Sequence, residues 1–191
     1  FNVAVFDQTI KGFQSNIFTG TGFALANAGA QSTQGLEVDA TWNATQNLTL
    51  GLAGTFLDPV YDSFPNSASG DISGQKPFGI SKVSTSASAV YTFEFQGLDS
   101  FVRGDWQYEG PATYFDDPAD QALIGEEREF SLFNASLGFQ SDSGISVLFW
   151  GRNIFDEQYI SVAFPTTAQA GSLSGYPNQP ATYGVTVRKA F

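Results

Sequence analysis

The chain has 191 residues and a formal net charge of −11, from 19 acidic and 8 basic side chains, and it contains neither cysteine nor histidine. The lack of thiols excludes disulfides and thiol chemistry, and the lack of histidine removes the commonest metal ligand and general base. The negative charge disfavours nucleic acid as a partner. We therefore expect a protein that is not an enzyme and that carries no cofactor or catalytic metal.

Apolar and polar residues alternate in almost every extended segment of the chain. In chain order, the clearest segments are residues 36–44, 48–56, 83–95, 102–109, 145–149 and 183–187. A period of two residues is typical of a β-strand with one apolar and one polar face. Such a pattern fits a soluble sandwich as well as a membrane barrel, but strands of about ten residues or more favour the barrel.

The connections between these segments alternate in length. Three are short and polar (Thr45–Asn47, Gln96–Asp99 and Ser141–Gly144), and four are long (Asn16–Ser32, Pro65–Gly79, Asp116–Glu126 and Pro165–Pro180). Outer-membrane barrels show this alternation between periplasmic turns and extracellular loops. The sequence therefore predicts an all-β fold: an antiparallel transmembrane barrel wall of about eight long strands, with both chain ends on the periplasmic side.

Three blocks of sequence carry a resemblance to a known family. They are Gln34–Ala40 followed by Asn47–Phe56, then Gly151–Tyr159, and finally Pro180–Phe191. The first block is similar to late barrel strands of TonB-dependent outer-membrane receptors. The second resembles their Asn-Leu-Phe-Asp-x-x-Tyr motif, and the third resembles their closing strand. Within that strand, the alternation of Tyr183, Val185, Val187 and Phe191 is similar to the signal that the barrel assembly machinery reads.

The resemblance implies a place for the chain in a larger protein. Barrels of this family have about 22 strands and a plugged lumen, so residues 1–191 correspond to a C-terminal segment without the plug or the earlier strands. The chain starts at Phe1 in mid-pattern, which also predicts a processed product or a piece of something longer. The intact protein would lie in the outer membrane of a Gram-negative bacterium and import a scarce large nutrient, most often a ferric siderophore.

The resemblance also implies partners. They are outer-membrane lipid and lipopolysaccharide, the remaining strands and plug of the same receptor, TonB through the missing N-terminal part, and the assembly machinery. An alternative stays open, because an even strand count also suits a self-contained small eight-stranded barrel with a structural or adhesive role.

Charged side chains suggest two kinds of feature. Arg103, Asp105 and Glu109 are expected on the lumen face, where an internal charge ladder is favoured over substrate contact. The acidic segment from Asp116 to Glu129 offers carboxylates for calcium, but its spacing does not match an EF-hand, so a solvated loop is favoured.

Aromatic and motif residues give the remaining candidates. Trp42, Tyr91, Trp106 and Tyr108 are expected in aromatic girdles, and Trp150 is expected to face inward beside Arg152. The candidates for ligand-facing loop aromatics are Phe64, Tyr114, Phe115, Phe164 and Tyr176. The motif residues Asn153, Phe155, Asp156 and Tyr159 are assigned instead to a kinked strand, in which Asn and Asp side chains satisfy local backbone groups.

Overall fold

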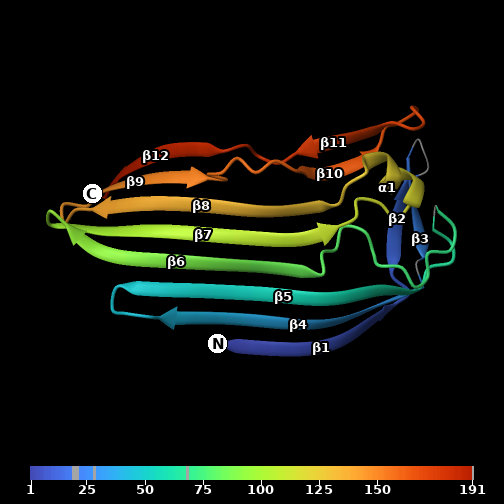
Figure 1. Ribbon diagram of the computed structural model, residues 1–191, viewed down its shortest axis with the longest axis horizontal. Coiled ribbons are helices and arrows are strands. Elements are labelled where there is room, and N and C mark those ends of the chain that lie inside the picture. The colour runs from blue at the N-terminus through green and yellow to red at the C-terminus, as the bar shows by residue number, and fades with distance from the viewer. Residues whose placement is uncertain (19–21, 28, 68, 191) are drawn as a thin grey trace.

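Figure 1 shows the computed structural model of the chain, which describes residues 1–18, 22–27, 29–67 and 69–190. Long antiparallel strands dominate it, as the period-two alternation predicts. The elements in chain order are β1 (Asn2–Lys11), β2 (Gln14–Phe18), β3 (Phe23–Asn27), β4 (Ala30–Asn43), β5 (Leu48–Ser63), β6 (Val83–Phe95), β7 (Leu98–Ala112), α1 (Pro118–Ile124), β8 (Arg128–Gln140), β9 (Ile145–Arg152), β10 (Ile160–Pro165), β11 (Leu173–Pro177) and β12 (Thr182–Lys189). Among these described residues, no helix has the length and hydropathy needed to cross a bilayer.

Eight of the strands form one antiparallel sheet in the order β1-β4-β5-β6-β7-β8-β9-β12. The prediction of about eight long strands in a barrel wall is confirmed. Figure 1 shows a single layer that is open at both edges, with the short turns at one end and the loops gathered at the other. Because β1 and β12 are not paired with each other over the described residues, the closed eight-stranded barrel is not what the structure shows.

The strand register gives the sheet one apolar and one polar face. One row across four strands joins Leu52, Ala87, Trp106 and Phe133, whereas the adjacent row joins Gly51, Ser88, Asp105 and Asn134. Paired residues in a sheet point to the same side, and successive residues point to opposite sides. The two faces therefore extend over the whole sheet.

The long connections, which are expected to be plain loops, contain regular structure. The first overlaps the β2–β3 hairpin, and the last contains β11, which pairs with β10 just before it; each hairpin is a separate two-stranded sheet. The third holds α1, which Asp117 caps at its N-terminus and Gly125 ends in the left-handed region, with φ of 71°. An N-cap aspartate followed by proline and a terminal glycine are ordinary helix boundary signals, so the sequence contained the information for this seven-residue helix.

Candidate functional site

The loop end of the sheet carries a small hydrophobic core. Tyr61 at the end of β5 packs against Phe64 with ring centroids 5.2 Å apart, and Phe13 stacks on Tyr61 at 6.1 Å. Ile72 completes this cluster and is almost fully buried. A core placed here holds the loops as folded units above the sheet, rather than leaving them as free connections.

Asp116 joins two of these loops. Its carboxylate accepts hydrogen bonds from the Tyr61 hydroxyl at 3.3 Å and from the Phe78 backbone N–H at 3.2 Å. Burial raises the pKa of Asp116, and the two hydrogen bonds offset part of that effect. This residue is therefore part of the loop packing, and not a fully solvated acid as the sequence analysis expected.

Asp117 makes a second link between the same loops. It accepts from the backbone N–H of Ala119 at 2.7 Å, as the cap of α1, and from the Ser69 hydroxyl at 2.9 Å. These donors lower the pKa of Asp117. Over the residues that the structure describes, no group of three or more acidic side chains is placed to hold a metal ion. Both aspartates thus act in loop packing and helix capping.

The predicted ligand-facing aromatics separate into buried and exposed side chains. Phe64 and Tyr114 are only 1% and 7% exposed, and the Tyr114 hydroxyl donates to the Ile160 carbonyl at 2.8 Å, so both are corrected to packing residues. Phe115 is half-buried beside Tyr114. Phe164 and Tyr176 form an exposed pair on the β10–β11 hairpin, with ring centroids 5.7 Å apart.

The predicted polar-face charges occur as neighbouring ion pairs. Arg103 binds Asp105 through two hydrogen bonds of 2.7 and 2.6 Å. Glu109 pairs with Arg128, whose guanidinium also donates to the Gly79 carbonyl at 3.2 Å. Alternation along β7 does not predict Arg128 as the partner of Glu109, because β7 and β8 shift register near Glu109.

Trp150 and Arg152 lie together on the polar face of β9. The Arg152 guanidinium carbon lies 5.3 Å from the centre of the Trp150 ring, and the indole N–H donates to the Thr186 hydroxyl at 3.3 Å. The ring covers Gly184 on β12, where a Cβ atom would come within 2.3 Å of it. Trp150 therefore fills space beside Arg152 and provides a platform for its cation.

The motif residues bridge the break between β9 and β10. Asn153 has a φ of 47°, and its amide donates to the carbonyls of Glu157 and Gln179 at 2.9 and 3.0 Å. Its side-chain oxygen accepts from the Glu157 N–H at 2.9 Å. Asp156 accepts from the Ala181 N–H at 2.9 Å, which ties the break in β9–β10 to the start of β12.

The two aromatic residues of the motif lie on opposite faces. Tyr159 stacks on Phe130 with ring centroids 4.4 Å apart, and Phe155 makes an edge contact with Phe133 at 5.1 Å on the apolar side. The aromatic residues therefore hold the interrupted strand against β8.

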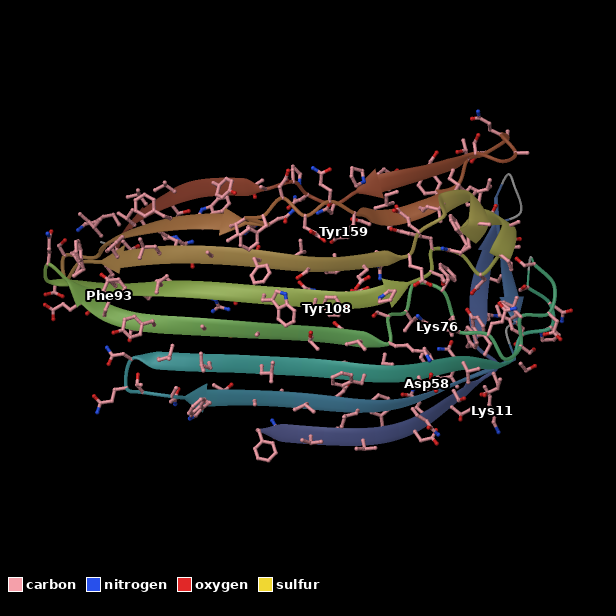
Figure 2. All side chains as sticks on the ribbon, viewed as in Figure 1. Lys11, Asp58, Lys76, Phe93, Tyr108 and Tyr159 are labelled. Carbon is pink, nitrogen blue, oxygen red and sulfur yellow. The ribbon has the colours of Figure 1, made fainter. Side chains whose placement is uncertain are left out.

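Aromatic residues also occur at two levels of the apolar face. Figure 2 shows Phe93 near the short turns and Tyr108 farther along the sheet toward the loops. Trp106 stacks with Tyr108 at 6.2 Å. Leu98, which pairs with Phe95 near the short turns, and Tyr108 mark the two levels on β7. At about 3.4 Å per residue and a strand tilt of about 40°, they lie about 25 Å apart along the barrel axis. This equals the usual height of the apolar band on an outer-membrane barrel.

The C-terminal strand continues this apolar face. Tyr183, Val185 and Val187 pair with Gly151, Phe149 and Val147 and are all exposed. Phe191, the last residue of the predicted assembly signal, lies outside the described residues.

Comparison with known proteins identifies the family. A model of the TonB-dependent receptor-like β-barrel matches residues 1–154. The chain belongs to the TonB-dependent receptor β-barrel family. A comparison with curated proteins gave no match.

A solved structure shares the fold of this receptor chain. It is the ferric yersiniabactin uptake receptor FyuA from Yersinia pestis, which matches with a TM-score of 0.78 at 18% sequence identity. The match covers 99% of this chain and 27% of that one, so the chain spans about a quarter of the solved receptor. The two-faced sheet is therefore part of a barrel wall.

Proposed function

We propose that the protein carrying this chain is a TonB-dependent transporter in the outer membrane of a Gram-negative bacterium. The observation that carries the proposal is the strand register, which gives one apolar and one polar face to a sheet that the family model matches. An apolar face of this height suits lipid, and the polar face with its ion pairs suits an aqueous lumen. Residues 1–191 would provide C-terminal wall and extracellular loops.

The transported nutrient in this proposal is a ferric siderophore. Support comes from the solved receptor that shares the fold, which by its name takes up ferric yersiniabactin. The exposed ring pair of Phe164 and Tyr176 offers an apolar platform at the loop end of the wall. A planar or apolar part of a chelate would stack there, since aromatic pairs form rigid contact surfaces.

The same proposal assigns the partners and excludes catalysis. The remaining barrel strands and a plug would complete the lumen, TonB would supply the energy through the N-terminal part, and the assembly machinery would insert the strands. Lipid and lipopolysaccharide would contact the apolar face. Proteins of this family are transporters, and we assign no enzymatic step to the chain.

The direct test is uptake of labelled ferric chelates by the native bacterium under iron limitation. Deletion of the receptor is expected to abolish uptake of one chelate, and deletion of TonB is expected to abolish the same uptake. Unchanged uptake of every chelate in the receptor deletion would refute the siderophore assignment. If another large nutrient is then lost in both deletions, transport stands with a different substrate.

An intact mass separates the transporter from the small barrel. The native protein in isolated outer membranes is expected to have several times the 20.5 kDa of this chain. A mass near 20.5 kDa would overturn the transporter proposal.

A further inference from the structure

Arg152 differs from two other arginines of the polar face, Arg103 and Arg128. Arg103 is held by Asp105 and Arg128 by Glu109, whereas Arg152 has no carboxylate partner among the described residues. It lies instead against the Trp150 ring. Arg188, nearer the short turns, shares its hollow with Glu94 and Asp99.

Arg152 is one of the residues that line a small polar hollow at the strand break. The hollow has a volume of about 280 Å³, and its lining includes Asn134, Tyr159, Ser161 and Gln179. Arg152 is the one fully charged side chain among the described residues that line it. The Asn134 oxygen accepts from the Asn153 N–H at 3.0 Å, which leaves the Asn134 amide hydrogens for another acceptor.

The cation is held in a defined place. Gly184 has no side chain, so the Trp150 ring can lie directly over it. The hydrogen bond from the indole N–H to the Thr186 hydroxyl then fixes the orientation of the ring. A guanidinium stacked on such a ring keeps its N–H edge free for a planar acceptor. Two parallel N–H···O bonds to a carboxylate are the geometry that this edge matches best.

We infer that Arg152, on its Trp150 platform, forms a lumen site for a single carboxylate group. The hollow is slightly smaller than the roughly 300–1,000 Å³ of pockets that enclose whole small ligands, so it takes one group of a larger molecule. That carboxylate belongs either to a soluble ligand in the lumen or to a polypeptide segment that lies there. The inference requires the barrel orientation but not the siderophore assignment.

A reporter thiol beside the site tests the inference. The chain has no cysteine, and Ser136 lies between Arg103 and Trp150 in the register, so Ser136→Cys places one thiol next to Arg152. The experiment compares the rates at which an anionic sulfonatoethyl and a cationic trimethylammonioethyl thiosulfonate modify this reporter thiol in the full-length protein. Any native cysteine elsewhere in that protein is first replaced by serine.

Arg152→Gln is expected to lower the anionic-to-cationic rate ratio about fivefold at low ionic strength, because one unit charge roughly 8 Å away acts on the two reagents in opposite directions. The matched control is the double variant Arg103→Gln with Asp105→Asn, which removes a nearby guanidinium together with its carboxylate and should leave the ratio unchanged. Arg152→Lys should keep the ratio but weaken protection by a carboxylate, since it loses the planar edge.

The occupant follows from the same reactions. If added succinate lowers the rate of modification by the anionic reagent in the protein with Arg152, but not in Arg152→Gln, the occupant is a soluble carboxylate. If the reporter thiol is protected from both reagents, and Arg152→Gln removes that protection, the occupant is a polypeptide carboxylate. If Arg152→Gln changes neither the ratio nor the protection while the protein still runs as a folded barrel, the inference is wrong.

Discussion

At the scale of single residues, two polar side chains stabilise the backbone at points where a strand or helix begins or ends. Asn153 supports the break between β9 and β10, and Asp117 starts α1 and joins it to the neighbouring loop. Each side chain satisfies backbone groups that would otherwise be left without partners at an interruption. Their contributions to stability are separable because they lie in different parts of the chain.

Asn153→Ala is expected to lower the free energy of unfolding by about 2–4 kcal/mol, because it removes three side-chain hydrogen bonds and puts alanine in the left-handed region. Urea unfolding in detergent, followed by circular dichroism, measures the change. Asn153→Gly is the control, since glycine accepts this φ and should be about 1 kcal/mol less damaging. Equal unfolding midpoints for Asn153→Ala and the unsubstituted protein would contradict the assigned role.

Asp117→Ala is expected to destabilise the loops by about 1 kcal/mol at pH 7 through loss of the helix cap. The pKa of Asp117 is lowered in the folded protein, so its contribution is present above the unfolded pKa of about 3.9 and is lost as the pH falls through the folded value. The difference between variant and unsubstituted protein should therefore shrink in acid.

This dependence on Asp117 is tested by protease cleavage of residues 113–127 at equilibrium. Cleavage is compared at pH 7 and at pH 3, with an acid-stable protease at pH 3. Asp117→Asn is the control, because asparagine keeps the cap without the charge. A difference for Asp117→Ala that stays the same at both pH values would argue against the carboxylate as the source.

At the scale of elements, the polar face repeats one packing device. An aromatic ring lies over a glycine directly across the ladder in three places, at Phe6 with Gly35, Phe101 with Gly138, and Trp150 with Gly184. Glycine alone weakens a strand, and a ring laid over it restores packing and fixes the register. The apolar side of the same strands has Gly104 with open space above it.

Gly138→Ala is expected to destabilise the wall by about 1–3 kcal/mol, because its Cβ would come within 2.2 Å of the Phe101 ring and force the ring aside. Gly104→Ala on the neighbouring strand meets nothing within 4 Å and should be neutral or slightly stabilising. Urea unfolding of the two variants side by side measures the contrast. Equal losses in both would show that backbone freedom, and not ring packing, decides the cost.

At the scale of the whole molecule, the two faces determine where each tryptophan lies. Trp42 and Trp106 belong to the apolar face, whereas Trp150 belongs to the polar face. In the proposed orientation of the wall, two indoles face lipid and one faces the lumen. This assignment depends on every strand between β4 and β12 keeping its register, since a slip by one residue would exchange the faces.

Lipids with brominated acyl chains are expected to quench Trp42 and Trp106 strongly and Trp150 weakly, since bromine stays in the hydrocarbon. The measurement uses full-length protein reconstituted in vesicles, with one of these tryptophans retained at a time and all others replaced by phenylalanine. The Trp106 protein serves as the positive control for insertion. Quenching of Trp150 to the same extent as Trp106 would refute the orientation of the wall.

The sequence by itself determined the approximate number of long strands, the short turns and which residues share a face. These features depend on local alternation and turn residues, which are visible in segments such as 83–95. It also predicted that Trp150 faces inward beside Arg152, which follows from alternation along one strand. The Asn153 motif was predicted to be a kinked strand with Asn and Asp satisfying backbone groups, and the structure shows a break between β9 and β10 there instead.

Only the tertiary structure decided which loop aromatics are buried and which cations have partners. Phe64 and Tyr114 look like exposed loop residues in sequence, yet their burial comes from contacts between loops far apart in the chain. The pairing of Glu109 with Arg128, and the unpaired state of Arg152 over the described residues, depend on a register shift between β7 and β8 and on the end of β9. Cross-strand distances set these interactions, and alternation along one strand does not contain them.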